Sequence, residues 1–249
     1  MAIVIRSPKE IKKMRRSGAA LRGVLDALRD SIAPGMTTMD LEKIAEAKIA
    51  SAGATPAFKG YRGYPCVLCT SVNSEVVHGI PSAKRVLKEG DVVSIDCGLI
   101  IDGYYSDSAI TLPVGKISES ASSLLAATER SLEAAIGAVK VGATLGDVGA
   151  AVQEVAEAAG FSIVRDFVGH GIGTQMHEEP QIPNFGQRGQ GIKLREGMVL
   201  AIEPMVNAGE PKVRVLEDGW TAVTVDGSLS AHFEHTVAVR AEGAEVLTA

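Results

Sequence analysis

The sequence is poor in residues that would cross-link the chain or place it in a membrane. It has three cysteines in 249 residues, an odd and small number that excludes a disulfide framework. No run of about 18 apolar residues occurs, so no transmembrane helix is expected. Charged residues follow the first methionine too closely for a signal peptide, and we expect a cytoplasmic protein with reduced thiols.

The chain also lacks an excess of basic residues and has few aromatic ones. Its net charge of −5 argues against nucleic acid as the main partner. Aromatic residues make up 4% and include a single tryptophan, Trp220, whereas hydrophobic residues make up 46%, enough for a sizeable core. Because no low-complexity segment or long linker interrupts the chain, we predict one domain over residues 1–249.

Two stretches of the chain are near-copies of each other. Residues 87–96 (LKEGDVVSID) resemble residues 194–203 (LREGMVLAIE) at an offset of 107. The same offset pairs further positions: Gly35, Thr37, Asp40, Ala52 and Gly53 with Gly142, Thr144, Asp147, Ala159 and Gly160. A register shared by helical and strand patterns indicates a duplicated α/β unit, with halves of roughly 7–113 and 118–240.

Each half is predicted to begin with two helices. Residues 7–10 (Ser-Pro-Lys-Glu) form a capping box with proline at the first helical position, and a second helix starts near Thr37. Equivalent helices are expected after Ser118 and Thr144 in the second half. The glycine after the second helix of each half can take the left-handed conformation that ends a helix.

Two strands are predicted after each helix pair. In the first half they cover residues 92–96 and 104–112, joined by a tight turn at Asp102-Gly103. In the second half they cover residues 198–205 and 234–239.

Acidic residues occupy matching places in these strands. The repeat pairs Asp96 with Glu203, and the second strand of each half pairs Asp107 with Glu234. A single acid at a strand end is usually solvated. Four in symmetric, apolar contexts would repel one another unless neutralised, and two divalent cations bridged by some of the carboxylates would neutralise them.

Three of the five histidines lie in loops rich in glycine or proline. They are His78, His170 and His177, and the glycines on both sides of His170 would let backbone approach it closely. We interpret the other two, His232 and His235, as hydrogen-bonded structural residues, with His235 alternating away from the neighbouring acid along the strand.

Taken together, these motifs resemble those of the type I methionine aminopeptidases. The motifs are His170-Gly-Ile-Gly, Ile202-Glu203-Pro204, Phe233-Glu234-His235-Thr236, and Asp96 and Asp107 eleven residues apart. The resemblance spans the chain from first helix to last strand. It implies an α+β pita-bread fold, with two pseudo-symmetric halves of antiparallel sheets and outer helices around a central dinuclear metal site. We expect the short bacterial form, which lacks the type II insertion and the zinc-binding extension of eukaryotic type I enzymes.

The resemblance also implies the metal ligands and their division. Asp96 would bind one ion, His170 and Glu203 the other, while Asp107 and Glu234 would bridge both. Two ions lower the pKa of a shared water and polarise a peptide carbonyl, which supplies a nucleophile at neutral pH. Oxygen ligands with one imidazole suit manganese, iron or cobalt ions better than structural zinc.

Further residues are expected to take part in the reaction. Glu203 is our candidate for carrying a proton from the water to the leaving amine. His177 would contact the scissile peptide and stabilise the tetrahedral intermediate, and His78 would interact with the peptide or the leaving group. The implied activity is removal of the initiator methionine when the second residue is small.

The resemblance places six residues around the methionine side chain: Phe58, Tyr61, Tyr64, Cys69, Met176 and Trp220. Aromatic rings and sulfur pack well against a thioether. Ordinary core packing is the alternative for Phe58 and Met176, and some relatives have an aromatic residue in place of Met176. We expect Tyr61 and Tyr64 to be more exposed than core residues, and Cys97, next to Asp96, to face the core.

Partners are less well defined by the sequence. The implied substrates are nascent chains, and Ala2 would allow the enzyme to process itself. The first helix carries seven basic residues, which either form a solvated face or dock near the ribosomal exit. We expect a monomer. Some relatives hold a monovalent cation at the positions of Asn73 and Ser230, and the sequence leaves open whether this chain does.

Two other functions remain open at this point. One is a proline-directed aminopeptidase or prolidase, which shares the five ligands but usually has a large preceding domain. The other is a non-catalytic pita-bread protein that binds a partner, a class that typically loses metal ligands. All five ligand positions are kept in this sequence.

Overall fold

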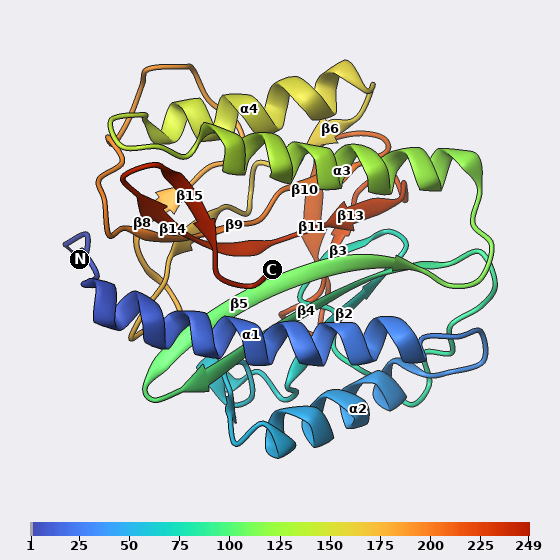
Figure 1. The fold of residues 1–249 in the computed structure, drawn as a ribbon. Coiled ribbons are helices and arrows are strands. Elements are labelled where there is room, and N and C mark those ends of the chain that lie inside the picture. The colour runs from blue at the N-terminus through green and yellow to red at the C-terminus, as the bar shows by residue number, and fades with distance from the viewer. Residues whose placement is uncertain (1) are drawn as a thin grey trace.

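The computed structural model describes residues 2–249, with two pairs of helices outside a set of antiparallel sheets (Figure 1). The helices are α1 (Pro8–Ser31), α2 (Thr38–Ser51), α3 (Glu119–Ala138) and α4 (Leu145–Ala158). The first pair runs along one side of the molecule and the second pair along the opposite side. All four predicted helices are confirmed. The Met1–Ala2 bond, predicted to be a substrate of the enzyme itself, includes a residue outside the described range.

The helices start where the capping signals predicted. At α1, the Ser7 side chain accepts a hydrogen bond from the backbone N–H of Glu10, and the Glu10 carboxylate accepts from the backbone N–H of Ser7 at 2.8 Å. The same reciprocal arrangement begins α2 and α4. Each cap contributes about 1 kcal/mol. At α3 the side chain of Ser118 alone caps the backbone.

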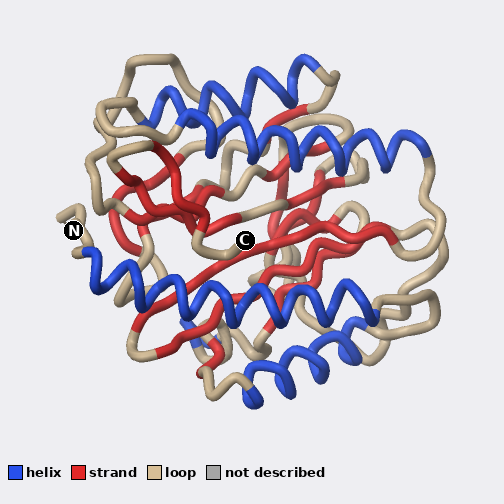
Figure 2. The backbone as a smooth tube through the Cα atoms, in the orientation of Figure 1, coloured by secondary structure: helices blue, strands red, loops and turns tan. Residues whose placement is uncertain are grey.

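The strands lie between the helix pairs (Figure 2). Those of the first half are β1 (Thr55–Pro56), β2 (Leu68–Val72), β3 (Glu75–Val77), β4 (Val92–Ile101) and β5 (Tyr104–Pro113). The rest are β6 (Ser162–Ile163), β7 (Gly169–Gly171), β8 (Glu178–Ile182), β9 (Val199–Ile202), β10 (Met205–Asn207), β11 (Val213–Val215), β12 (Ala222–Thr224), β13 (Ser230–His232), β14 (His235–Arg240) and β15 (Gly243–Val246). The main sheets are β1-β4-β2 with β5 paired to β4, and β15-β14-β9-β7-β8.

Two core clusters join the helices to these sheets. Leu25 of α1, Leu41 of α2 and Ile95 of β4 are fully buried in the first cluster. Val148 of α4 and Leu200 of β9 are fully buried in the second. Each such side chain contributes roughly 1.5–3 kcal/mol through burial, so the amphipathic helices are fixed against the strands that carry the candidate site.

The predicted turn at Asp102-Gly103 is confirmed. Both residues have positive φ, 52° and 77°, which is the requirement of a two-residue hairpin turn whose twist matches its strands. The flanking residues Ile101 and Tyr104 are partners in the β4–β5 ladder. This hairpin is longer than predicted and places Asp96 and Asp107 on adjacent strands.

The predicted strand over residues 198–205 is wrong in its extent. It is divided into β9 and β10 by Glu203 and Pro204. Proline has no N–H to give to a ladder, and the two parts join different sheets: β9 pairs with β14 and β7, whereas β10 pairs with β13 and β6. Glu203 therefore lies at the break between two sheets and, within residues 2–249, has no partner residue on a neighbouring strand.

The two main sheets meet where β5 approaches β14. The side chain of Thr236 accepts from the backbone N–H of Asp107 at 3.1 Å and donates to its carbonyl at 2.8 Å. The backbone N–H of Glu234 donates to Ala109 at 2.9 Å. These bonds hold Asp107 beside Glu234, although the two lie in different parts of the sequence.

The segment between Glu203 and Glu234 forms β10 to β13. Within it, β12 pairs with β3, and Trp220 lies in the turn just before β12. This pairing brings Trp220 to Tyr64, with ring centroids 5.0 Å apart in an edge-to-face arrangement. A residue without a counterpart in the repeat thus reaches the same cavity as the repeated acids.

Candidate active site

One cavity of about 170 Å³ collects every residue that the sequence assigned to the site. Its walls are formed by Phe58, Tyr61, Arg62, Tyr64, Cys69, His78, Asp96, Asp107, His170, Met176, His177, Glu203, Trp220 and Glu234. Of these, Arg62 alone was not predicted. The acidic and imidazole groups therefore line the same cavity as the aromatic and sulfur-containing side chains.

The four carboxylates come from four different places in the fold. Asp96 lies on β4 and Asp107 on β5, whereas Glu203 follows β9 and Glu234 precedes β14. Asp107 and Glu234 are only 3% and 2% exposed. One oxygen each of Asp96, Asp107 and Glu234 is buried without a hydrogen-bond partner among the described residues. Buried carboxylate oxygens without donors are what a bound cation would satisfy.

Burial raises the pKa of all four carboxyl groups, and repulsion by neighbouring acids adds to it at Asp107, Glu203 and Glu234. Desolvation raises the pKa of Asp96 to about 7. Desolvation is also the main cause at Asp107, where the charge of Glu234 raises the pKa further, and at Glu203, where the charge of Asp107 does so. Glu234 is raised by burial and then by Glu203. Without a counter-charge the cluster favours protonated carboxyls.

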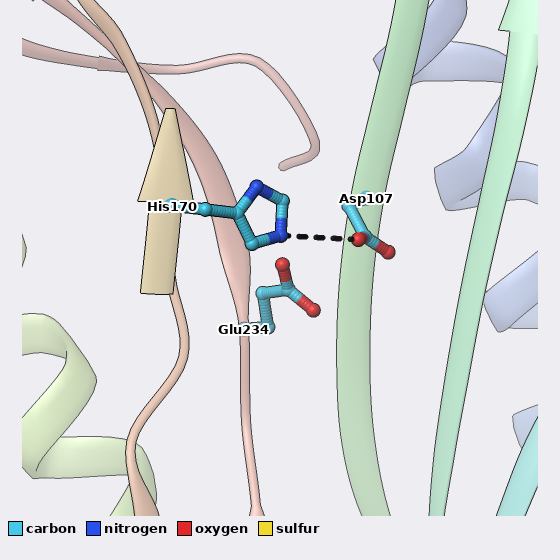
Figure 3. Close-up of side chains that lie close together, drawn as sticks. All are labelled: Asp107, His170 and Glu234. Carbon is cyan, nitrogen blue, oxygen red and sulfur yellow. Dashed lines mark ion pairs between the residues drawn. The ribbon is translucent and has the colours of Figure 1, made fainter. Parts of the chain in front are cut away.

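His170 presents one ring nitrogen to these acids (Figure 3). Its Nδ1 lies 2.9 Å from the Gly171 carbonyl, which can only accept, so Nδ1 carries the proton. Nε2 then offers its lone pair 3.8 Å from Asp107 and 3.7 Å from Glu203. Burial lowers the pKa of His170 to about 3 and keeps it neutral. Neutral imidazole is the form that binds metals.

The glycines around His170 are required by packing. A Cβ at Gly169 would lie 2.3 Å from the Ala201 carbonyl oxygen, and one at Gly171 would lie 2.3 Å from the Glu179 carbonyl oxygen. Close approach of β7 to its neighbours therefore excludes any side chain at these positions. Ligand atoms of Asp107, His170 and Glu234 lie within 4.8 Å of one another, so these three residues could hold a metal ion.

Two further histidines, His177 and His78, line the cavity. His177 Nδ1 lies 2.9 Å from the Tyr61 hydroxyl, and its ring centroid lies 4.2 Å from that of His170. Desolvation, followed by the charge of Arg62, lowers the pKa of His177. His78 has a positive φ of 62°, rare for a residue with a side chain, and packs edge-on against Phe167. Burial lowers the pKa of His78 as well.

The apolar wall of the cavity is tightly packed. The prediction that Tyr64 is more exposed than a core residue is wrong: it is 3% exposed, and its hydroxyl donates to the carbonyls of Leu68 and Gly79 at 2.9 and 3.0 Å. Phe58 and Met176, at 7% and 3%, are both core residues and part of the cavity wall. The two interpretations offered for them are therefore compatible.

The two nearby cysteines face different sides of the same sheet. Cys69 is the ladder partner of Asp96 and lines the cavity. Cys97 is fully buried in the first core cluster, as predicted. Desolvation raises the pKa of both thiols, so both are neutral and behave as small apolar groups.

The interpretation of His232 as a hydrogen-bonded structural residue is wrong, because its Nε2 atom has no hydrogen-bond partner among the described residues. That atom is buried and lies 3.8 Å from the Glu203 carboxylate. The imidazole of His235 does have the expected partner, the hydroxyl of Thr248 at 2.8 Å. No periodicity in the sequence distinguishes these two histidines, because the difference lies in tertiary contacts: His232 lies beside Glu203, and His235 beside Thr248.

The fold and the cavity together define a pita-bread metallopeptidase. The sequence profile described as metallopeptidase family M24 matches residues 12–241, and the chain belongs to this family. Over 246 residues it is 51% identical to the methionine aminopeptidase of Clostridium perfringens, covering 99% of this chain and 98% of that protein. It is 48% identical to methionine aminopeptidase 1 of Bacillus subtilis, covering 99% of each.

Solved structures agree with this assignment. The methionine aminopeptidase of Thermotoga maritima superposes with a TM-score of 0.98 at 50% identity, covering 99% of both chains. A prolidase from Pyrococcus horikoshii shares the fold, with a TM-score of 0.80 and 24% identity over 63% of its own length. The predicted fold class is confirmed. Among residues 2–249, no helix is long and apolar enough to cross a membrane.

Proposed function

We propose that the protein removes the amino-terminal methionine of polypeptides and holds two divalent metal ions while doing so. The residues proposed to hold the ions are Asp96, Asp107, His170, Glu203 and Glu234. The observation that carries this proposal is the set of buried carboxylate oxygens without hydrogen-bond donors, in the same cavity as the unprotonated nitrogen of His170. Two cations would replace the missing donors and remove the repulsion among the acids.

The division of ligands follows their positions. The backbone of Asp107 is hydrogen-bonded to the Thr236 side chain, and the backbone of Glu234 to that of Ala109. These bonds hold the two acids side by side, which supports a bridging role for both. Bound ions lower the pKa of water and neutralise the charge that develops on the attacked peptide carbonyl. Oxygen-rich ligands favour manganese, iron or cobalt over structural zinc.

The protein's own groups then handle protons and orientation. Glu203 lies at the break between β9 and β10, where its carboxylate can accept a proton from water and pass it to the leaving amine. His177, held by Tyr61 at the mouth of the cavity, stabilises the tetrahedral intermediate. His78 contacts the peptide beyond the cleaved bond. Low pKa values keep both imidazoles neutral, so each can donate one hydrogen bond.

The apolar wall selects methionine. Tyr64 and Trp220 present ring edges and faces, and Cys69 presents a neutral thiol. A thioether packs favourably on both kinds of surface. Because Tyr64 uses its hydroxyl to bind two backbone carbonyls, its ring is fixed and offers a rigid apolar surface.

Two finer features of the function belong to the same proposal. Substrates are nascent chains whose second residue is small, since the cavity of about 170 Å³ is shared by the metal ligands and the methionine side chain. A monovalent cation near Asn73 and Ser230 is supported by the close approach of these residues, whose backbone atoms are joined by a 2.9 Å hydrogen bond.

The test is a panel of three peptides with the metal-reconstituted protein. Methionine release from Met-Ala-Ser should be fast, release from Met-Leu-Ser should be slow, and an Xaa-Pro dipeptide should not be cleaved. Equal cleavage of the first two would contradict the preference for a small second residue. Preferential cleavage of the Xaa-Pro peptide would favour a prolidase, and metal-free, inactive protein would favour a binding role.

A further inference from the structure

Arg6 forms a buried ion pair with Glu178, the residue that follows His177. The two side chains are only 5% and 9% exposed. Nη2 of Arg6 donates to both carboxylate oxygens of Glu178, at 2.5 Å to Oε2. A buried ion pair often adds little net stability, because desolvation of the charges offsets their attraction. Its geometry, however, fixes both partners.

The Glu178 carboxylate also closes the turn that precedes it. Its Oε1 accepts from the backbone N–H groups of Thr174 at 2.9 Å and Gln175 at 3.1 Å. The residues between these donors and Glu178 are Met176 and His177, both of which line the cavity. One carboxylate, anchored by Arg6, therefore fixes both ends of the turn that carries them.

Arg6 is in turn held by the surrounding backbone. Its N–H donates to the Gly197 carbonyl at 2.7 Å, which fixes the amino-terminal segment beside the turn before β9. A Cβ at Gly173 would lie 2.1 Å from Nη2 of Arg6. The last glycine of the His-Gly-Ile-Gly motif is thus needed for the guanidinium to reach Glu178.

We propose that Arg6, acting through Glu178, positions His177 over the cavity and is a positioning residue for methionine removal. This inference rests on the proposed function, in which His177 acts on the peptide. His177 touches Tyr61 at 2.9 Å and lies 4.2 Å from the His170 ring. A misplacement of about 1 Å in such a group can lower the rate about 100-fold. The amino-terminal segment is therefore part of the catalytic apparatus without touching substrate.

The test is a double-mutant cycle in kcat on Met-Ala-Ser with the metal-loaded enzyme. Arg6→Met should lower kcat between about 10- and 100-fold in the wild-type background. In the His177→Ala background the same substitution should change kcat by less than about twofold, since the group that Arg6 positions is already absent. Arg6→Lys should fall between, because lysine keeps the charge but not the planar guanidinium whose Nη2 contacts both oxygens of Glu178.

A matched control is available on the surface. Arg188 binds Glu154 through two hydrogen bonds of 2.9 and 2.5 Å, but both side chains are more than half exposed and neither lines the cavity. Arg188→Met should leave kcat unchanged. Calorimetric titration with Mn²⁺ should give the same stoichiometry for the Arg6 variants as for wild type, because Arg6 contacts none of the proposed ligands.

The outcomes separate the two proposals. Equal loss from Arg6→Met in both backgrounds would overturn the positioning role and assign Arg6 to general stability. Full turnover in His177→Ala alone would instead refute the catalytic role of His177, and with it the reason for the cycle. Should Arg6→Met fail to fold, Arg6→Lys and Glu178→Gln are measured in the same two backgrounds. A loss from either that depends on His177 supports the inference, and a loss that does not depend on it overturns the inference.

Discussion

The hydroxyl of Tyr61 lies 2.9 Å from Nδ1 of His177, and the two rings stack with their centroids 5.3 Å apart. Tyr61 lies in a 3₁₀ turn of the first half, whereas His177 belongs to the second. The contact orients the imidazole of His177, which makes no other side-chain hydrogen bond to the described residues.

Loss of this contact should reduce turnover without loss of metal. Tyr61→Phe removes one hydrogen bond of about 1 kcal/mol, which corresponds to roughly a fivefold lower kcat. The ring stacking remains, so KM for Met-Ala-Ser should change less than kcat. Steady-state kinetics on the metal-loaded variant measures both. An unchanged kcat would show that the Tyr61 hydroxyl does not orient His177.

Removal of the imidazole itself should have a larger effect. His177→Ala deletes a donor to the developing negative charge, and loss of one such donor lowers kcat about 100- to 1,000-fold. No proposed ligand hydrogen-bonds to His177, so Mn²⁺ stoichiometry measured by calorimetry should equal that of wild type. A variant that loses metal together with activity would point to a structural role instead.

Metal removal should make the stability of the protein depend on pH in an unusual direction. In the unfolded chain carboxyl groups titrate near pH 4. In the folded metal-free protein desolvation raises the pKa of Asp96 to about 7, and the pKa values of Asp107, Glu203 and Glu234 are raised as well. Between these values the four carboxyl groups bind more protons in the folded state than in the unfolded state, so their contribution to stability falls as pH rises.

Thermal unfolding of the metal-free and Mn²⁺-loaded protein at pH 5 and pH 8 checks this. Buried histidines, whose pKa values are lowered to about 3 or 4, oppose this trend below about pH 6.5, so the decisive quantity is the difference between the two forms. The metal-free protein should melt further below the loaded protein at pH 8 than at pH 5, because the cations neutralise the carboxylates and binding adds stability by mass action. An equal difference at both pH values would argue against neutralisation of these acids by metal.

Cys69 should affect substrate binding, whereas Cys97 should not. Cys69→Ser replaces a thiol of the apolar wall by a more polar hydroxyl, and the resulting cost of about 1 kcal/mol should raise KM for Met-Ala-Ser roughly fivefold. Cys97→Ser introduces the same change on the core side of the sheet, where Cys97 is 0% exposed. It should lower the unfolding free energy and leave KM unchanged. Equal KM values for the two variants would remove Cys69 from the methionine pocket.

Thr236 should stabilise the junction of the two main sheets. Thr236→Val leaves the backbone N–H and carbonyl of Asp107 without their side-chain partner, at a cost of about 1–3 kcal/mol. Denaturant unfolding measures the loss. The matched control is Thr70, which is 2% exposed and whose hydroxyl has no partner among the described residues. Thr70→Val should be neutral, and a cost equal to that of Thr236→Val would contradict the account.

Much of the fold could be predicted because its signals are local. Capping residues such as Ser7 and Thr144 begin helices through bonds that span three residues, and Asp102-Gly103 requires only its own backbone conformation. The break at Pro204 was also a local signal, since proline cannot donate to a ladder. It was missed because the apolar alternation continues on both sides of it.

The cavity could be predicted from the repeat and from the motifs, but its supporting contacts could not. Asp96 and Glu203 end matching decapeptides, and His170 is marked by its glycines. The partnership of Arg6 with Glu178 joins residues 172 positions apart, and nothing in either neighbourhood indicates it. The burial of Tyr64 likewise depends on the carbonyl of Gly79, which a turn brings to its hydroxyl.

The central claim is that four clustered carboxylates and one imidazole make the removal of methionine depend on metal. The most direct measurement is methionine release from Met-Ala-Ser by metal-free protein as Mn²⁺ is added in steps. The account predicts no release before addition, release that rises to saturation as the ions bind, and none at any concentration for Asp107→Asn. Full release by the metal-free protein in excess chelator would contradict it.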